Sequence, residues 1–413
     1  MLSFIDIAYL FFAFVTIFFS FLMFVLYYEN RKNLRSTPLM SEIPSVSVVI
    51  PAYNEEKSIA DTIKSVLNFD YPKDKLKVIV VDHSSTDRTG EIARQFSGIT
   101  VLKKLREGRE RKAHALNYGL KFADTEMAAC VDADSYPEPD SLAKAVAHFT
   151  SPEVGAVTTS IFVKDPKNFI EKLQNLEYIL IVWARKLLES VGGVYVTPGP
   201  LSIYRLSALR EVGWFDEKNM TEDIEIAWRL MSRGYLIKMS LDSNVFTKAP
   251  SKFKVWWHQR MRWNVGGIQT SLKYMPALFK KEYKSLGTFV LPFFFFSYVI
   301  SVFGMAVFMY ITIKGAWDFS YILFKSYEVG ASIKSPVFFD YIFLPSIFTI
   351  FGIFIFLLSL WWIRISLKST NKKISGLSGI VELLIYLSIY ITIFPFSLLY
   401  SGIKYIREGA EEW

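Results

Sequence analysis

The stretch Val46–Glu56, which reads VSVVIPAYNEE, decides the fold class of this chain. Its first residues form a nearly continuous apolar run, which is typical of a strand covered on both faces of a parallel sheet. The run enters a polar turn, and beyond it Ile59, Ile63 and Val66 recur at helical spacing. A buried strand followed by an amphipathic helix is the repeating unit of an α/β fold.

Two further stretches repeat this scheme, LKVIVVDHSSTD at Leu76–Asp87 and MAACVDADS at Met127–Ser135. We therefore predict one α/β domain over residues 44–250, with a mainly parallel sheet and helices on both faces. In such sheets, ligands bind beyond the carboxyl ends of the strands. The polar side chains predicted at these ends are Tyr53, Glu55, Asp82, Asp132 and Asp134.

The composition points to a membrane protein, because 52% of the 413 residues are hydrophobic. The net charge of +8 suits anionic lipid, a phosphate-bearing substrate or nucleic acid. We expect no nucleic-acid partner, since no basic stripe accompanies a recognisable binding motif. The single cysteine, Cys130, excludes a disulfide or a thiolate metal site within one chain and fits a reducing, cytoplasmic environment.

Four apolar segments lie toward the two ends of the chain, and each is roughly long enough to cross a bilayer as a helix of ~20 residues. They are Ile7–Tyr28, Leu286–Ile313, Tyr341–Ile363 and Ile380–Ile403. Basic residues after the first segment and between the last two place the middle of the chain inside the cell. We therefore expect an integral protein of the cell (plasma) membrane whose central domain is cytoplasmic.

This pattern divides the chain into four parts. They are an N-terminal transmembrane anchor with a basic linker (1–43), the cytoplasmic α/β domain (44–250), interfacial helices (251–285) and about three C-terminal transmembrane helices (286–413).

The pair Asp132 and Asp134 flanks a single residue at the end of the third predicted strand. Two such carboxylates can hold Mg²⁺ or Mn²⁺, a hard cation that keeps water and bridges phosphates. The alternative is a pair of turn aspartates that bond locally, but the position after a strand favours the metal. Two roles are likewise open for Asp82: it could cap the next helix, or it could accept a hydrogen bond from a nucleotide base.

The motif TED, Thr221 to Asp223, opens a predicted helix. Thr221 suits the N-cap, and acidic residues in the first turn are favoured by the helix dipole. Helix capping could therefore explain the motif alone. The sharper hypothesis makes Asp223 a general base, which requires a carboxylate within ~3 Å of a hydroxyl and a pKa raised by partial burial. Glu222 is expected to point elsewhere and to orient the turn.

The motif QRMRW ends at Trp263, and if its surroundings are helical, Gln259, Arg262 and Trp263 share one face. The guanidinium could neutralise a departing diphosphate, while the indole offers a flat apolar surface to a sugar ring. In the competing interpretation this is an interfacial helix, whose basic side chains face lipid headgroups and whose indoles enter the boundary. That interpretation involves Lys252, Lys254, Arg260, Arg262, Trp256 and Trp257.

Taken in order, the motifs PAYNE, DHSSTD, KAHALN, DAD, TPGPLSIYR, TED and QRMRW cover roughly residues 44–270. This set resembles glycosyltransferase family 2, in particular its membrane-embedded branch with hyaluronan, chitin, cellulose and poly-N-acetylglucosamine synthases. The resemblance implies a GT-A nucleotide-sugar fold, a UDP-linked donor, and a divalent cation, Mg²⁺ or Mn²⁺. It also implies inverting transfer of a hexose or N-acetylhexosamine to a growing polysaccharide.

The resemblance further implies a role for individual residues. Lys112, which alone would be interpreted as a solvated charge in the run RERK, is placed near the donor. Asp223 is the catalytic base, and Asp134 with Asp132 holds the metal. The implied donor-binding residues are Ala52, Tyr53, Glu55, Asp82, Lys112, Asp132, Gln259 and Arg262. The implied acceptor-binding residues are Gly199, Pro200, Glu222 and Trp263.

Three alternatives stay open, of which the polyprenyl-phosphate sugar transferases rank below the nearest rival because they generally lack the first anchor and QxxRW. The chain has fewer predicted membrane helices than the polymer synthases, so a glycolipid synthase that adds one sugar to a lipid acceptor is the nearest rival. A hypothesis of another class is an inactive nucleotide-sugar-binding membrane scaffold or glycan-export channel. The presence of every ionisable motif position argues against that scaffold.

Overall fold

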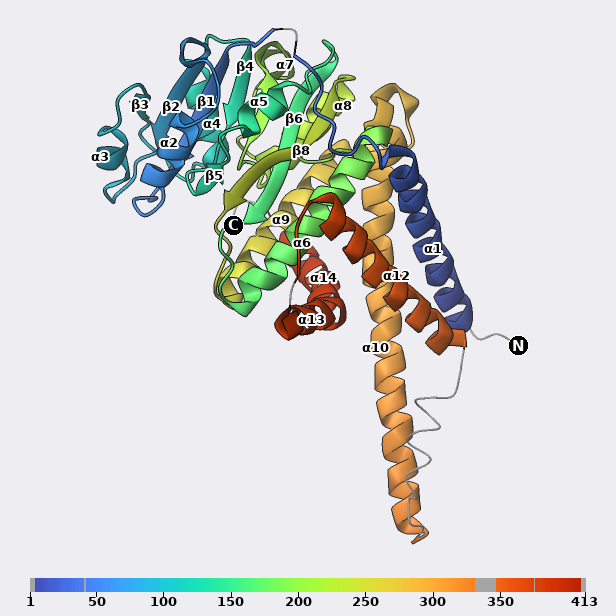
Figure 1. Ribbon diagram of the computed structural model, residues 1–413. Coiled ribbons are helices and arrows are strands. Elements are labelled where there is room, and N and C mark those ends of the chain that lie inside the picture. Colours follow the sequence, from blue (N-terminus) through green and yellow to red (C-terminus); the bar gives the residue numbers. More distant parts are fainter. Residues whose placement is uncertain (1–3, 41, 331–346, 375, 410–413) are drawn as a thin grey trace.

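The computed structural model describes residues 4–40, 42–330, 347–374 and 376–409, and an eight-stranded sheet forms the centre of the domain above the long helices (Figure 1). The strand order is β3-β2-β1-β4-β7-β6-β8-β5. The strands are β1 (Val46–Ala52), β2 (Leu76–Asp82), β3 (Thr100–Lys103), β4 (Met127–Cys130), β5 (Ser135–Pro137), β6 (Val154–Val163), β7 (Ser202–Arg205) and β8 (Leu236–Thr247).

The three strands predicted from the sequence lie side by side and run parallel. β1 pairs with β2 on one side and with β4 on the other, in registers that align Ala52 with Asp82 and Val49 with Cys130. The other half of the sheet is mixed, because β7 runs antiparallel between β4 and β6, while β8 is parallel to β6 and antiparallel to β5. The predicted α/β fold class is confirmed. The four-residue strand β7 is too short for a pattern of hydrophobicity to reveal its direction.

Helices cover both faces of the sheet, as alternation of side chains along each strand requires. Val49, Ile79 and Val81 face one apolar cluster, and Val48 and Ile50 face the other. The helices of this domain are α2 (Ile59–Leu67), α3 (Thr89–Ala93), α4 (Lys112–Leu120), α5 (Ser141–Val146), α6 (Phe169–Leu188), α7 (Leu206–Val212), α8 (Glu222–Ser232) and α9 (Phe253–Tyr274).

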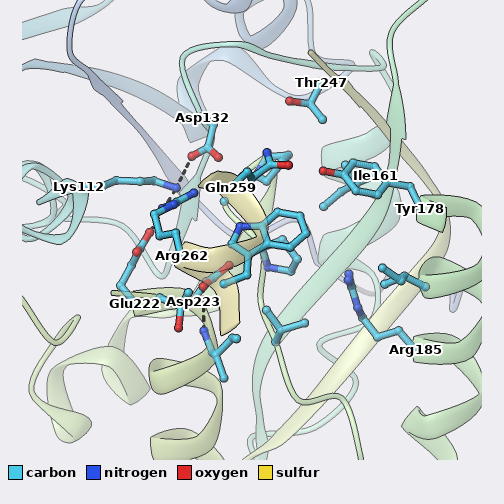
Figure 2. Close-up of a pocket in the computed structure, with 18 of the residues that line it drawn as sticks. Lys112, Asp132, Ile161, Tyr178, Arg185, Glu222, Asp223, Thr247, Gln259 and Arg262 are labelled. Atoms are coloured by element: carbon cyan, nitrogen blue, oxygen red, sulfur yellow. Dashed lines mark hydrogen bonds and ion pairs between the residues drawn. The ribbon is translucent and has the colours of Figure 1, made fainter. Parts of the chain in front are cut away.

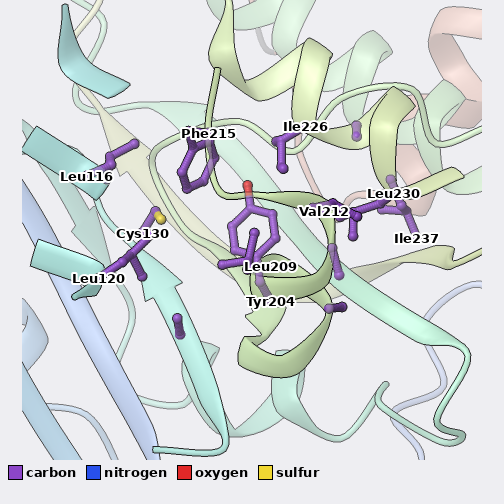
Figure 3. Packing of buried hydrophobic residues seen from close by; sticks show 14 of the residues in the cluster. Leu116, Leu120, Cys130, Tyr204, Leu209, Val212, Phe215, Ile226, Leu230 and Ile237 are labelled. Carbon is purple, nitrogen blue, oxygen red and sulfur yellow. The ribbon is translucent and has the colours of Figure 1, made fainter. Parts of the chain in front are cut away.

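The first cluster shows how closely α4 approaches the sheet (Figure 3). A Cβ atom on Gly119 would lie 2.6 Å from Val49 and 2.8 Å from Val81, so only glycine allows this contact. Cys130 is buried in the same cluster beside Leu116 and Leu120, and burial raises the pKa of its thiol to about 12. The thiol is therefore a packing group rather than a nucleophile.

Four helical stretches among the described residues are long and apolar enough to cross a membrane: Leu10–Asn30, Leu286–Glu328, Ile350–Ser369 and Gly376–Arg407. They belong to α1 (Phe4–Asn30), α10 (Leu291–Glu328) with the π-helical turn before it, α12 (Ile347–Ser369), and α13 (Gly376–Ile385) with α14 (Ile391–Glu408). The second stretch reaches well beyond the expected end at Ile313. Residues 341–346 of the expected span Tyr341–Ile363 lie outside the described part of the chain.

Helix α6 packs against β6 and β8 and against α1 and α12, while α9, which follows β8 in the chain, packs against α14 (Figure 1). The two helices thereby join the sheet to the long apolar helices. Trp183 of α6 packs against Trp362 of α12, with ring centroids 5.1 Å apart. Trp256 of α9 donates a hydrogen bond to the Tyr390 hydroxyl, which lies just before α14, at 2.8 Å.

This contact corrects the expected placement of two α9 residues at the lipid boundary. Trp256 and Arg260 were expected to face lipid, yet they are only 3% and 6% exposed. Both Arg260 Nη atoms donate to the carboxylate of Glu177 on α6, at 3.0 and 2.5 Å. A buried guanidinium needs such a partner, and Glu177 provides it inside the protein.

Candidate active site

Two adjoining cavities open at the carboxyl ends of the parallel strands. The strand-end cavity, of about 450 Å³, is lined by Pro51, Ala52, Tyr53, Glu55, His83, Arg106, Glu110, Arg111, Lys112, Ala115, Asp132, Ala133, Asp134, Met220, Glu222 and Arg262. The helix-side cavity, of about 340 Å³, is lined in part by side chains of α6 and α9 (Figure 2). Its lining residues include Asp223, Gln259 and Trp263. Five residues line both cavities: Lys112, Asp132, Asp134, Glu222 and Arg262.

The segments that follow β1, β2 and β3 form one wall of the strand-end cavity. Tyr53 is half exposed, and the Arg106 guanidinium lies over its ring at 4.7 Å from the centroid. His83 Nε2 contacts the Glu110 carboxylate at 2.5 Å. Glu55 accepts a hydrogen bond from Ser58 Oγ at 2.5 Å. An aromatic ring and several cations at one edge of the sheet suit a flat base joined to phosphates.

Asp82 does not line either cavity. Its carboxylate is buried at the end of β2 and accepts a hydrogen bond from the Ser85 N–H at 3.0 Å. A Cβ atom on Gly90 would collide with the same carboxylate, so the turn closes tightly around it. The geometry is that of a residue shaping its turn, and contact with a nucleotide base stays a prediction.

Lys112 holds together two carboxylates from distant parts of the chain. Its Nζ forms an ion pair with Asp132 and a second one with Glu222 at 3.3 Å. Burial alone would lower the pKa of Lys112, but the charges of Asp132 and Glu222 outweigh it and raise the pKa. The solvated-charge interpretation of Lys112 is therefore wrong.

The orientation of Glu222 also differs from the expectation. It was expected to point elsewhere, yet it is only 8% exposed and lines both cavities. The physical reason is its ion pair with Lys112, a residue whose proximity no local pattern could reveal.

The loop containing Gly199 closes over this ion pair. The Asp132 N–H donates to the Gly199 carbonyl at 3.1 Å. A Cβ atom on Gly199 would collide with Lys112 Nζ and with both Asp132 carboxylate oxygens, so no other residue fits without displacing them. Gly199 and Pro200 line the helix-side cavity, which brings the predicted acceptor loop next to the predicted donor residues.

Asp134 carries the charge pattern expected of a cation ligand. Burial, together with the nearby carboxylates of Asp132 and Glu55, raises its pKa to about 6. A bound cation would relieve this concentration of negative charge. Within the described ranges no group of three or more His, Cys, Asp or Glu side chains is placed to hold a metal. Mg²⁺ needs only one or two carboxylates when phosphates and water complete its shell, so the residues fit.

Asp223 lies in the first turn of α8 and faces the helix-side cavity. Its side chain accepts the Ile224 N–H at 3.0 Å, and its carbonyl accepts both the N–H and the hydroxyl of Thr197. Burial and the nearby Glu222 carboxylate raise its pKa to about 6, against the opposing charges of Lys112 and Arg262. A carboxylate with this pKa can accept a proton near neutral pH.

Helix capping does not account for the TED motif by itself. Thr221 occupies the N-cap position, but its hydroxyl makes no capping hydrogen bond. Instead Asn219 Oδ1 accepts the Thr221 N–H at 2.9 Å and holds the turn. The Asp223 side chain lines the helix-side cavity.

The α9 residues Gln259, Arg262 and Trp263 all line the helix-side cavity. Gln174 of α6 donates to Gln259 Oε1 at 3.0 Å, which orients the Gln259 amide. A Cβ atom on Gly266 would collide with the side chain of Thr221, so this glycine lets α9 lie directly against the turn that precedes Asp223.

Sequence reasoning missed the residues that α6 contributes. Tyr178, Val182 and Arg185 line the helix-side cavity together with Tyr195. None of these four residues belongs to a motif. The only sequence pattern that could have indicated the α6 residues is their spacing i, i+4, i+7, which places Tyr178, Val182 and Arg185 on one helix face.

The sheet with its covering helices is a GT-A type fold. The chain matches the family described as glycosyltransferase like family 2 over residues 44–266, more than half of its length, and it belongs to that family. The predicted family is confirmed.

Named relatives agree with this assignment. The chain is 33% identical over 279 residues to a probable glycosyltransferase, YdaM, of Bacillus subtilis, covering 64% of this chain and 65% of that protein. It is 31% identical over 255 residues to a poly-beta-1,6-N-acetyl-D-glucosamine synthase of Staphylococcus epidermidis, covering 61% of each. The match thus spans less than two thirds of each relative.

A solved structure supports the fold over nearly the whole chain. The mannosyltransferase PcManGT from Pyrobaculum calidifontis, in complex with GDP-Man and Mn²⁺, is 19% identical and superposes with a TM-score of 0.58. The superposition covers 96% of this chain and 98% of that one, so the likeness includes the long helices as well as the sheet.

Proposed function

We propose that this protein is a metal-dependent, inverting glycosyltransferase at the cytoplasmic face of the cell membrane. It transfers a sugar from a nucleoside-diphosphate donor, UDP-linked, to a growing polysaccharide. The observation that carries the proposal is the convergence of Asp134, Asp223 and Trp263 on one cavity at the junction of the sheet and the long helices. Family membership and the polysaccharide synthase among the relatives support it.

The donor belongs in the strand-end cavity, beside Ala52, Tyr53 and Glu55. Its diphosphate would then reach Lys112 and Arg262 at the boundary between the cavities. Asp132 and Asp134 are the residues that would hold Mg²⁺ or Mn²⁺, which neutralises negative charge on the leaving diphosphate. The Arg262 side chain forms no ion pair with any described residue, so its charge is available to the same group.

The acceptor belongs in the helix-side cavity. Trp263 offers a flat apolar surface for a sugar ring, and the loop at Gly199 and Pro200 limits its position. Asp223 takes the proton from the acceptor hydroxyl, whose oxygen attacks the anomeric carbon while the bond to the diphosphate breaks. Lys112 already engages Asp132 and Glu222, so Asp223 is the carboxylate suited to act as the base. A single displacement inverts the anomeric centre.

A second candidate function is the addition of one sugar to a lipid acceptor. The observation that favours it is the packing of the cavity walls α6 and α9 against α1, α12 and α14, which places the cavity beside the predicted bilayer. The two candidates share the donor chemistry and differ in the length of the product.

The experiment is a screen of nucleotide sugars with the full-length protein in lipid nanodiscs, with Mn²⁺, with Mg²⁺ and with EDTA. Release of nucleoside diphosphate is measured, and the products are analysed by mass. We expect metal-dependent release with one donor, UDP-N-acetylglucosamine being tested first and GDP-mannose second. A ladder of products supports the polymerase, and one added sugar supports the glycolipid synthase. No release with any donor, in the presence of lipid and oligosaccharide acceptors, would favour the inactive scaffold.

A further inference from the structure

One buried cation in the candidate active site has no ion-pair partner among the residues that the structure describes. Arg185 of α6 is only 5% exposed, and its Nε and Nη1 atoms lack a hydrogen-bond partner in the described part of the protein. Its side chain forms no ion pair with any described residue. Figure 2 shows the guanidinium reaching from α6 toward the helix-side cavity, which Arg185 lines.

Another buried arginine in the described part of the protein and a partly buried one are both paired, which sets Arg185 apart. Arg260, with a similar exposure of 6%, forms a two-bond ion pair with Glu177. Arg229 is paired with the buried carboxylate of Glu225. Desolvating an unpaired guanidinium is costly, so an arginine kept in this state is expected to receive its counter-charge from a ligand.

The neighbours of Arg185 cannot supply that charge. Burial raises the pKa of the Tyr178 and Tyr195 phenols, so both stay neutral near neutral pH. Asp223 lines the same cavity and its charge acts on Arg185, but the two side chains form no ion pair. The phenols are instead suited to donate hydrogen bonds to the same ligand.

The position of Arg185 separates it from the donor. It lines the helix-side cavity and is absent from the strand-end cavity, whereas Lys112, Asp132 and Arg262 line both. Figure 2 places Arg185 on the opposite side of the cavity from Lys112 and Asp132. The leaving diphosphate is therefore served by Lys112 and Arg262, and the ligand of Arg185 belongs to the acceptor.

We propose that Arg185 binds an oxyanion carried by the acceptor, with the hydroxyls of Tyr178 and Tyr195 beside it. This inference rests on the proposed function and adds that the acceptor is anionic. The shared chemistry is a phosphate or carboxylate group, which an arginine fork can bind with two hydrogen bonds. Its source is either a lipid-linked phosphate or a uronic acid in the glycan.

The test measures binding to the full-length protein in nanodiscs of phosphatidylcholine, using two matched pairs of probes. One pair is a polyprenyl monophosphate and its polyprenol, and the other is a disaccharide ending in glucuronate and its glucose counterpart. We expect one anionic probe to bind ~10-fold or more tightly than its neutral partner, the scale of a charge-assisted hydrogen bond. The pair that shows this preference identifies the source.

The substitution Arg185→Gln should abolish the preference and leave the affinity for the neutral probe unchanged. Arg185→Lys keeps the charge without the fork and should retain part of the preference. The matched control is Arg233→Gln, an exposed position at the end of α8 that lines neither cavity. This control should retain the full preference.

Binding of UDP and of GDP, each with Mn²⁺, tests the proposed donor site in the same samples. If neither nucleotide binds the unsubstituted protein, the proposed function fails. If a nucleotide binds normally but neither anionic probe is preferred, Arg185 is hydrated only by water and the inference is overturned. The same holds if the preference survives in Arg185→Gln. If Arg185→Gln loses nucleotide binding through misfolding, the result for Arg185→Lys is used instead. An undiminished preference for the anionic probe in Arg185→Lys would refute binding by two guanidinium hydrogen bonds, and a reduced preference would support it.

Discussion

The two cavities of the active site differ in how their charges are arranged. In the strand-end cavity, charges are largely paired within the protein, as in Glu110 with Lys104 and, where the two cavities meet, Asp132 with Lys112. In the helix-side cavity, Arg185 has no ionic partner among the described residues, and Asp223 accepts its side-chain hydrogen bond from a backbone N–H. The strand-end cavity is therefore largely organised before a ligand binds. The helix-side cavity instead contains charged side chains whose ionic partners would come from a ligand. Substitutions in the first should therefore weaken donor binding, and those in the second should act on turnover or on the acceptor.

The largest effect is expected for Asp223→Asn. The amide keeps the shape of the side chain but cannot accept the proton, so kcat should fall ~100-fold or more, the scale of general-base loss. Donor affinity should change little, because Asp223 does not line the strand-end cavity. Steady-state kinetics and nucleotide binding measure the two quantities. Asp61→Asn, at an exposed position on α2, is the matched control, and a kcat near that of the control would contradict the assignment.

A second test concerns the proposed metal site beside the donor. Asp134→Asn removes one of the two carboxylates proposed to hold the cation, so the Mn²⁺ concentration needed for half-maximal activity should rise ~10-fold or more, at least the cost of losing a supporting group at a metal site. A titration of activity with Mn²⁺ measures this shift. An unchanged requirement would show that Asp134 does not contribute to the metal site.

The pH profile provides a test of intermediate size. The base works when deprotonated, and the raised pKa of Asp223, about 6, means that it becomes protonated as the pH falls below that value. At saturating metal, kcat/KM should rise with pH up to about 6 and then level off, with about tenfold lower activity one unit below the pKa. The inflection should be absent from the residual activity of Asp223→Asn. Its persistence in that variant would assign the titration to another group.

The smallest effect is expected for Gln174→Leu. Gln174 is buried on α6 and donates hydrogen bonds to Gln259 and Tyr178, so its loss frees the Gln259 amide to rotate. One neutral hydrogen bond contributes about 0.5–1.5 kcal/mol, which corresponds to a ~2–10-fold loss of kcat/KM. Nucleotide binding should be unaffected, since Gln174 lines neither cavity. An equal loss of nucleotide affinity would show that the two cavities are not separable.

The strand-end cavity was largely predictable because its parts are local. Tyr53, Glu55, Asp132 and Asp134 each follow a buried strand within a few residues, and parallel strands deliver their carboxyl ends to one edge. Any sequence that encodes such strands therefore also encodes the neighbourhood of these side chains. Asp82 shows the limit, because the same position after a strand also suits a residue that only closes its own turn.

The helix-side cavity depends on packing between distant segments, which no local pattern records. Arg185 becomes part of the site only because α6 lies across β6 and β8, and Glu222 turns inward only because Lys112 attracts it. Gly266 has a specific role that appears only when α9 is seen against Thr221. The burial of Arg260 likewise follows from Glu177 on another helix. Periodicity identified these helices but not the partners of their side chains.

The Tyr390 hydroxyl, which accepts from Trp256 and donates to Glu177, ties the substrate-facing helix to the last hydrophobic segment of the chain. These two hydrogen bonds join α9 to the segment that ends in α14. If that segment spans a bilayer as proposed, a change in its tilt with bilayer thickness would be transmitted to α9, which carries Arg262 and Trp263. The thickness of the bilayer would then alter the shape of the proposed acceptor site.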